Sequence, residues 1–365
     1  MMSFAQWGNA LYSGEKSYPI IGKHRLFVGL AGILSVLSIA AIAIFGINLS
    51  IDFTGGSQFS VTGVSSTDQQ IAYDTLKAQG VTSDVRVSNM GQNGVRVQSP
   101  ALDTAKTQDV RAALADAYKV SEAEVDSNSI GPTWGQDVAK KALQSVLIFV
   151  AIVAIVMAVY FRSWTMSLAA LLALLHDVLL TVAFFAITRV EVSPATVIGF
   201  LTILGYSLYD TVVVFDKVRE LTKGVHDQRR YTYGELVNLA VNQTMVRSIN
   251  TSVVAVLPVG AILFLGTWLL GSGTLTDISL ALFVGMIAGA YSSIFIASPI
   301  LVMLEERRAK TRDHNDAVAA RRRAQAGEGG EDGGDVVPQV RVAPVQPGQH
   351  LGQAAQPKRK SREKR

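Results

Sequence analysis

Four ionisable side chains lie inside long apolar stretches of this 365-residue chain. Side chains of these types can carry protons or form buried polar contacts. They are His176, Asp177, Asp210 and Arg247. An acid or a base at the centre of a membrane-spanning helix costs about 2.5–3.5 kcal/mol on insertion scales, so such residues usually serve a transport pathway or have a buried partner. These four residues are therefore the first candidates for chemistry.

Asp210 lies on a helical face suited to close packing. Tyr206 precedes it by about one turn, Gly199 lies further along the same face, and Gly205 and Ser207 are small residues that allow helices to approach each other. Desolvation and a nearby cation act in opposite directions on the proton affinity of a buried carboxyl group, so small movements can load or release a proton. We expect a proton-carrying acid here, and the alternative is a static hydrogen bond between helices.

Arg247 is expected at the same depth as Asp210. Both residues are equally distant in sequence from Gln228-Arg229, the turn of a predicted antiparallel helical hairpin. The sequence therefore predicts an ion pair between them, in a polar zone that includes Asn250 and Thr251. The alternative is an interfacial arginine whose charge reaches the lipid headgroups.

His176 and Asp177 interrupt a run of Leu and Ala, and adjacent residues project from different sides of a helix. They are predicted to form a buried polar network that supports the proton-carrying residues. Asp177 and Asp210 together would also suit an intramembrane aspartyl protease, because two carboxylates that share one proton can activate water. The residues before Asp177 are Leu-Leu-His rather than the Gly-x-Gly that such proteases use, which argues against that class.

Apolar runs of about 20 residues must position these side chains, and that length crosses a hydrocarbon core of roughly 30 Å. The sequence predicts a helical membrane protein with six spans: Leu26 to Ile47, Lys140 to Tyr160, Trp164 to Thr188, Pro194 to Phe215, Met245 to Leu269 and Ile278 to Leu304. The predicted segments are a cytoplasmic N-terminus (1–25), the first span (26–47), an extracytoplasmic domain (48–138), the remaining helical bundle (139–304) and a disordered basic cytoplasmic tail (305–365).

Basic residues in short loops predict the orientation, because Lys and Arg near span ends stay in the cytoplasm. Lys217, Arg219 and Lys223 follow the fourth run, and Arg307 and Arg308 follow the sixth. Both termini should then lie on the cytoplasmic side of a bacterial inner membrane. The tail is expected to contact anionic lipid.

The net charge of +4 is explained by this topology, so no nucleic-acid partner is expected. The chain has no cysteine, and its sequence shows no metal-ligand cluster, catalytic triad or phosphate-binding loop. We expect neither a cofactor nor a metal, and no enzymatic activity.

The extracytoplasmic block is predicted to be a ferredoxin-like α+β domain. Strands are expected at 57–63, 84–90, 95–98 and 124–130, and helices at 67–79 and 104–118. A turn at 91–94, rich in residues that tolerate positive φ, joins the middle strands. The order β-α-β-β-α-β defines this arrangement but does not specify a function.

Several motifs in these segments resemble the SecF signature of the SecD/SecF family. They are Ile51-Asp52-Phe53-Thr54-Gly55-Gly56 after the first span, Leu175-His176-Asp177-Val178 in the third, the stretch 205–220 in the fourth, and Arg247-Ser248-Ile249-Asn250-Thr251-Ser252 in the fifth. The resemblance covers residues 20–305 in order.

The resemblance implies a proton-gradient-coupled auxiliary subunit of the Sec preprotein translocase, within the RND superfamily. Its partners would be SecD, the SecYEG channel, the translocating preprotein and membrane lipid. Asp210 matches the family's intramembrane proton-carrying acid and Arg247 its basic counterpart, while Asp52, Phe53, Gly55 and Gly56 lie where the first span meets the outer domain. Half of an RND-type exporter of small molecules or lipids is the alternative.

Overall fold

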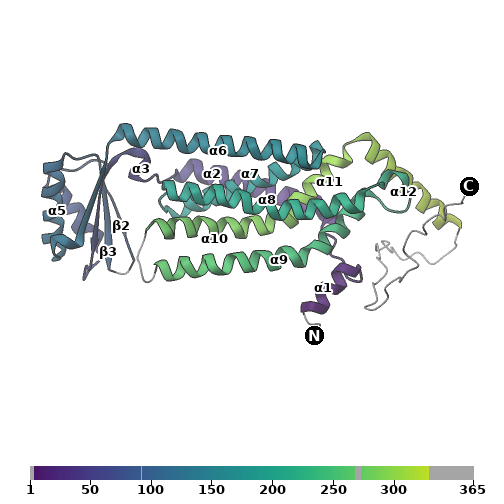
Figure 1. The fold of residues 1–365 in the computed structure, drawn as a ribbon, viewed down its shortest axis with the longest axis horizontal. Coiled ribbons are helices and arrows are strands. Elements are labelled where there is room, and N and C mark those ends of the chain that lie inside the picture. Colours follow the sequence, from purple (N-terminus) through teal and green to yellow (C-terminus); the bar gives the residue numbers. More distant parts are fainter. Residues whose placement is uncertain (1–3, 92, 268–272, 329–365) are drawn as a thin grey trace, which may run out of the picture.

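The computed structural model describes residues 4–91, 93–267 and 273–328. Within them, six helical segments are long and apolar enough to cross a membrane, as predicted: Ile21–Phe45, Pro132–Phe161, Trp164–Thr188, Pro194–Asp227, Tyr233–Leu265 and Thr274–Glu306. They form an elongated bundle with the outer domain at one end and the helices α1 (Phe4–Ser13) and α12 (Ala309–Glu328) toward the other (Figure 1). The end of the fifth predicted span, at Leu269, lies outside the described residues.

The bundle is built from helices of unequal burial. They are α2 (His24–Phe45), α6 (Pro132–Phe161), α7 (Trp164–Thr188), α8 (Pro194–Thr222), α9 (Tyr233–Leu265), α10 (Thr274–Ser292) and α11 (Ser298–Glu306). Half of the apolar window of α7 is buried within the chain, against 11% for α2 and for α6. The inner helices therefore form the protein core, and α2 and α6 leave most of their surface for lipid or another protein.

Small residues bring α8 and α10 into close contact. A Cβ atom on Gly285 would lie 2.3 Å from Ile203, one on Gly199 would lie 2.7 Å from Ala281, and one on Gly289 would lie 3.0 Å from Ser207. Such close approach is the usual way in which membrane helices gain packing energy. The packing role expected of Gly199 is thus observed, whereas Gly205 faces open space.

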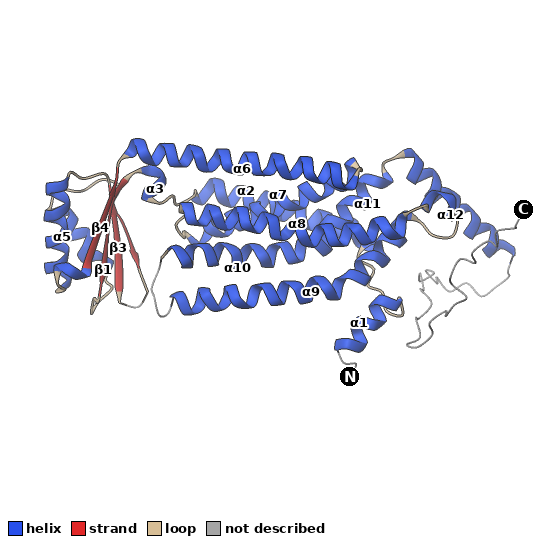
Figure 2. Ribbon diagram, in the orientation of Figure 1, coloured by secondary structure: helices blue, strands red, loops and turns tan. Residues whose placement is uncertain are grey.

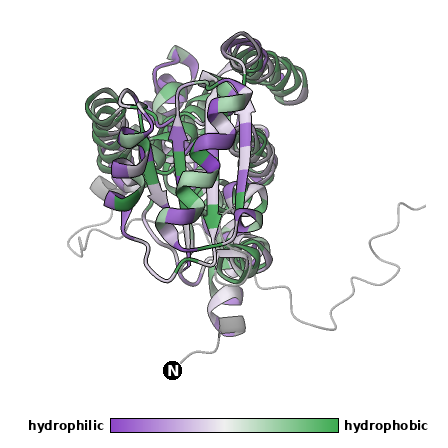
Figure 3. Ribbon diagram, turned by 90° about the vertical axis from the view of Figure 1, so that its left-hand side faces the viewer, coloured by the Kyte–Doolittle hydropathy of each residue, from purple (hydrophilic) through white to green (hydrophobic). Residues whose placement is uncertain are grey.

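The outer domain has the predicted β-α-β-β-α-β order. Its elements are β1 (Gly56–Thr62), α4 (Gln69–Ala78), β2 (Arg86–Asn89), β3 (Gly94–Ser99), α5 (Thr104–Tyr118) and β4 (Val125–Ile130), and the antiparallel sheet has the order β2-β3-β1-β4 (Figure 2). Phe59, Val61, Val97 and Leu114 belong to the fully buried core of this domain. Its elements mix hydrophilic and hydrophobic residues, whereas the membrane helices behind them are mostly hydrophobic (Figure 3). Gln92, in the predicted hairpin turn, lies outside the described residues.

The Asp52 motif forms a short helix, α3 (Ile51–Thr54), between α2 and the sheet. A Cβ on Gly55 would lie 2.6 Å from the Cα of Pro132, and one on Gly135 would lie 2.7 Å from the backbone nitrogen of Gly55. The Ser50 hydroxyl donates to Asp52 over 3.1 Å, and Phe53 packs among Phe185, Val192 and other residues of a small core. The two glycines therefore let the start of the domain cross the start of α6 at backbone contact.

The predicted boundaries change at several points. The helix α6 begins at Pro132, within the block assigned to the outer domain. The helix α9 begins at Tyr233, because Thr232 caps its start and the partly polar residues 233–244 continue the helix of the fifth span. The helix α1 (Phe4–Ser13) was not predicted. It lies against α9, where the Gln243 side chain donates to the Tyr12 carbonyl over 2.9 Å.

The prediction of disorder from residue 305 onward is wrong for the described part of that tail. Residues Ala309–Glu328 form α12, in which Val318 is fully buried. Arg322 donates to both carboxylate oxygens of Glu235 over 2.8 and 2.9 Å, and His314 lies 3.0 Å from the Tyr231 carbonyl. The basic and polar sequence of this segment suggested disorder. The helix forms because its side chains contact residues at and just before the start of α9. Residues 329–365 lie outside the described range.

We predict that Gly55→Ala destabilises the protein by about 2–5 kcal/mol, because the new methyl group would meet Pro132 and the backbone has φ +75° and ψ 165°, a region that is nearly exclusive to glycine. Thermal unfolding of the purified protein in detergent measures the effect. Gly80→Ala is the control: φ is +78° there and nothing lies within 4 Å, so only about 1–2 kcal/mol should be lost. Equal losses in both variants would contradict the steric role of the crossing.

Candidate functional site

Asp210 lies in the middle of α8, with only 3% of its surface exposed. Its two carboxylate oxygens each accept one hydrogen bond from a serine of a neighbouring segment. The Ser248 hydroxyl of α9 donates to Oδ1 over 2.8 Å, and the Ser293 hydroxyl donates to Oδ2 over 2.5 Å. The acid therefore joins three segments of the bundle through neutral donors.

Ser293 begins a π-helical segment, Ser293–Ala297, between α10 and α11. Pro299 follows shortly after this segment; it has no backbone N–H and its ring crowds the carbonyl of the residue four positions earlier, which disfavours a regular α-helix here. Single turns of π-helix inside α-helices are found frequently at functional sites. The local widening places two consecutive serines, Ser292 and Ser293, next to two different acids.

The second acid is Asp177 of α7, which is fully buried. Its Oδ2 accepts from the Ser207 hydroxyl over 2.5 Å and from the Ser292 hydroxyl over 2.7 Å. Among the described residues, its Oδ1 and both ring nitrogens of the buried His176 have no hydrogen-bond partner. Asp177 is thus held by Ser207 of α8 and by Ser292, whose neighbour Ser293 holds Asp210.

The predicted ion pair between Asp210 and Arg247 is wrong. Arg247 is exposed, and its guanidinium lies 3.5 Å from the hydroxyl of Tyr209, which is 54% exposed. Consecutive residues are rotated by about 100° around a helix axis, so Ser248 faces Asp210 while Arg247 faces outward. The predicted equal depth is observed, because residues 209 and 210 contact residues 247 and 248 in register.

The other predicted polar residues do not join this network. The Tyr206 and Ser252 hydroxyls are buried, and neither bonds to the two acids. Asn250 is exposed and Thr251 is half-buried. Sequence reasoning missed the serines that hold the acids, since a serine in an apolar helix is common, and only the pair Ser292-Ser293 before Pro299 is unusual.

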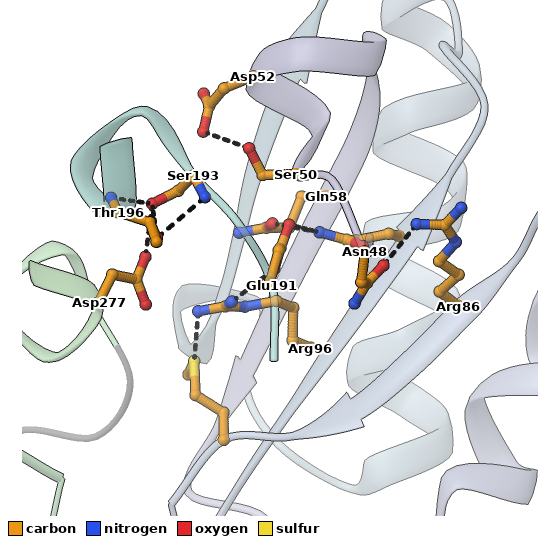
Figure 4. A network of polar contacts seen from close by, with 12 residues as sticks. Asn48, Ser50, Asp52, Gln58, Arg86, Arg96, Glu191, Ser193, Thr196 and Asp277 are labelled. Carbon is orange, nitrogen blue, oxygen red and sulfur yellow. Dashed lines mark hydrogen bonds and ion pairs between the residues drawn. The ribbon is translucent and has the colours of Figure 1, made fainter. Parts of the chain in front are cut away.

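A second polar network connects the outer domain with the bundle (Figure 4). Glu191, in the connection between α7 and α8, accepts from Arg96 over 3.0 Å and from Gln98 over 2.6 Å, both on β3. Arg86 of β2 donates to Asn48 over 2.6 Å. These bonds hold the helix-free face of the sheet against the outer ends of the membrane helices.

The same junction includes the outer ends of α8, which carries Asp210, and of α10, which leads to Ser293. The Ser193 hydroxyl, which caps the start of α8, donates to Asp277 in the first turn of α10 over 2.9 Å. Asp277 and Asp52 line a cavity of about 670 Å³ beneath the sheet, together with Glu191 and Arg96. The described residues contain no group of three or more His, Asp or Glu side chains that could hold a metal ion.

Comparisons with known proteins place these residues within two family patterns. A family described as "Protein export membrane protein SecD/SecF, C-terminal" matches residues 109–307, and one described as "SecD/SecF GG Motif" matches residues 40–62. The first range contains both buried acids, and the second contains the Asp52 motif.

Individual relatives match most of the chain. "Protein translocase subunit SecF" of Streptomyces coelicolor is 40% identical, over 90% of this chain and 88% of the relative. The protein of the same description from Mycobacterium tuberculosis H37Rv is 39% identical, over 88% of this chain and 75% of the relative. The crystal structure of SecDF from Thermus thermophilus, described as a translocon-associated membrane protein, superposes with a TM-score of 0.72 and 30% identity, covering 80% of this chain and 39% of that one.

We predict that Glu191→Gln loosens the outer domain from the bundle, because Arg96 and Gln98 lose a charged acceptor, worth about 1–3 kcal/mol. The chain has no cysteine, so Ser60→Cys, in the cavity beneath the sheet, provides one labelling site. Its reaction with a water-soluble maleimide should accelerate about 5- to 150-fold. Glu220→Gln, which removes a pair with Lys217 on a largely exposed carboxylate, should leave the rate unchanged. Unchanged labelling in both variants would show that Glu191 does not hold the domain.

Proposed function

The chain belongs to the SecD/SecF family of protein-export membrane proteins, as a translocase subunit of the SecF type, and we propose that it couples the proton gradient to completion of preprotein export. The observation that carries the proposal is Asp210, which is buried between helices and, within the described part of the chain, is held by the hydroxyls of Ser248 and Ser293. The relatives are described as translocase subunits, which favours protein export over the small-molecule or lipid exporter considered as the alternative.

The surroundings of Asp210 suit a group that changes its protonation state. Two hydroxyl donors stabilise the carboxylate, while no basic side chain of the described residues forms an ion pair with it, so its charge is only partly compensated at the centre of the bundle. A hydroxyl can also accept a hydrogen bond, so a protonated Asp210 can donate to either serine. Both the charged and the protonated form of Asp210 can therefore be hydrogen-bonded. The two forms would place Ser248 of α9 and Ser293 of the π-helical segment differently.

Movement at Asp210 can reach the outer domain through two helices. Asp210 lies 16 residues from the start of α8, which corresponds to about 24 Å along the helix. The end of α10 opposite the Ser293 segment carries Asp277, which contacts Ser193 at the outer junction. A shift of α10 along α8 would therefore change the support beneath the sheet. We infer that this is how proton binding moves the domain that acts on the emerging chain.

The partner of this chain is proposed to be SecD. Two relatives are single proteins described as SecDF, of which the aligned part covers 39%. One face of α8 and α9 exposes polar residues along the apolar bundle: Thr202, Tyr209, Arg247 and Asn250. An arginine that faces hydrocarbon is costly in free energy. We therefore propose that this face packs against another membrane protein. Near it, the SecYEG channel would deliver the preprotein.

The orientation follows from charge at the two ends of the bundle. Lys217, Arg219, Arg307 and Arg308 lie at the end that carries α1 and α12, opposite the outer domain (Figure 1). Basic residues near span ends favour the cytoplasm. We therefore propose the bacterial cytoplasmic membrane, with both termini inside and the basic α12 near anionic lipid.

We predict that Asp210→Asn slows preprotein export strongly while the protein still assembles, because asparagine keeps the shape and accepts one serine bond but cannot carry a proton. Export of a secreted reporter is measured in cells depleted of the native protein, with membrane levels matched by blotting. Asp216→Asn is the control, since this acid lies on the same helix near its cytoplasmic end and accepts from the Tyr160 hydroxyl. Normal export that still depends on the proton gradient in Asp210→Asn would refute the proposed role.

The face of α8 can be tested separately. Gly205 is exposed on it and has nothing within 4 Å, so Gly205→Leu adds bulk without disturbing this chain. We predict that SecD no longer co-purifies in mild detergent. Gly32→Leu on α2, which is equally open, should leave co-purification unchanged. Loss of SecD only from the α2 variant would place the interface elsewhere.

A further inference from the structure

The proposed mechanism leaves Asp177 unused, although it is the most deeply buried acid of the membrane bundle that the structure describes. It lies on α7, and its carboxylate receives two hydrogen bonds, from Ser207 and from Ser292, both to the same oxygen. The other oxygen, Oδ1, is buried and has no partner among the described residues. A static structural acid would be expected to satisfy both oxygens, since an unmet acceptor in an apolar setting is costly.

The two buried acids differ in how their oxygens are satisfied. In Asp210 each oxygen accepts from a hydroxyl, which suits an ionised carboxylate. In Asp177 both donors converge on Oδ2, which suits a carboxylic acid whose proton is on Oδ1. The two acids are thus held differently: the hydroxyl donors are divided between the two oxygens of Asp210 and gathered on one oxygen of Asp177.

No cation compensates Asp177 in the described structure. The buried ring of His176 projects from another side of α7 and makes no hydrogen bond, and Arg247 faces away from the acids. Apart from Asp210, the remaining ionisable residues of the described helices packed against α7 lie toward the helix ends or are tyrosines: His24, Arg25, Asp137, Lys140, Lys141, Tyr160, Tyr206, Tyr209, Asp216, Lys217, Arg219, Glu220, Asp277, Tyr291, Glu305 and Glu306. The ionised form of Asp177 therefore depends on its two serines.

The consecutive residues Ser292 and Ser293 link the two acids physically. Ser292 donates to Asp177 and also lies 3.3 Å from the Gly289 carbonyl, while Ser293 donates to Asp210 and lies 3.3 Å from the Ala290 carbonyl. Each hydroxyl can therefore turn from its acid to a carbonyl three residues earlier, and then accept from the protonated acid. Because both serines adjoin the π-helical segment, a shift that suits one acid displaces the donor of the other.

We propose that Asp177 is a second proton-binding carboxylate of the transport cycle, coupled to Asp210 through Ser292 and Ser293. The inference rests on the proposed proton-coupled function and names a further residue of its pathway. When Asp210 takes up a proton from outer water, an O–H bond forms on Oδ2, the acid donates to Ser293, and the Ser293 hydroxyl turns to the Ala290 carbonyl. The accompanying shift carries the Ser292 hydroxyl from Oδ2 toward Oδ1 of Asp177, so that each oxygen then has its own donor. The O–H bond on Oδ1 breaks, and its proton passes to water on the inner side.

The test is pH-dependent infrared difference spectroscopy of the full chain with its partner in lipid. Protonated carboxyl groups give a C=O stretching band. We expect Asp177→Asn to remove a band that wild type shows at neutral pH and to shift the pH midpoint at which Asp210 is protonated. The band that is lost in Asp210→Asn is assigned to protonated Asp210. A persistent neutral-pH band, or an unchanged Asp210 midpoint, in Asp177→Asn would overturn the proposal.

A milder variant keeps the test decisive if Asp177→Asn does not accumulate in membranes. Ser292→Ala retains both acids and should shift the frequency of the Asp177 band, because one hydrogen bond is lost. Ser279→Ala is the matched control: it lies on the same helix, and its hydroxyl bonds only to its own helix carbonyls of Leu275 and Thr276. An Asp177 band that is unmoved in Ser292→Ala would refute the coupling.

These spectra also separate the inference from the proposed function. Unaffected export in Asp210→Asn would refute the proton-coupled function whatever the spectra show. Slowed export in Asp210→Asn, combined with spectra and a pH profile of export that Asp177→Asn leaves unchanged, would refute only the role of Asp177.

Discussion

The structure depends on one constraint: a carboxylate in the middle of a membrane bundle must find its hydrogen-bond donors within the protein. Asp177 and Asp210 obtain theirs from serines on neighbouring segments, and a serine side chain is short. The helices must therefore approach closely, which the glycines at 199, 285 and 289 permit. The glycine packing, the serine positions and the π-helical turn are then parts of one solution to the same solvation problem.

The sequence predicted the large elements and the acids, but not how the acids are held. Runs of apolar residues identify spans because their length is dictated by the bilayer, and alternation identifies the strands of the outer domain. The rotation of one helix against another is not encoded locally. The choice between Arg247 and Ser248 as the partner of Asp210 changes with a single position, or about 100° of rotation. Likewise, α12 forms on a polar sequence because Glu235, far away in the chain, supplies its partner.

The connection between membrane and outer domain combines two kinds of contact. At Gly55 and Gly135 the backbones of α3 and α6 touch, so this crossing has no room to rearrange. At Glu191 and Asp277 the contacts are polar and partly exposed to a cavity, so they can break and be replaced by water. A domain held by one rigid crossing and several exchangeable bonds can tilt about the crossing without leaving the bundle.

The start of α9 collects contacts from both ends of the described chain. Asn238 and Asn242 bind the backbone of residues 18 and 21, and Glu235 binds Arg322 of α12. During synthesis, α9 emerges long after the first segment and before the last. The polar side chains at its start therefore find their partners in two steps. Asn238 and Asn242 can bind the N-terminal segment as soon as α9 is made, whereas Glu235 can bind Arg322 only after α12 has been made. The ion pair between Glu235 and Arg322 can therefore form only in a chain that has been synthesised through α12.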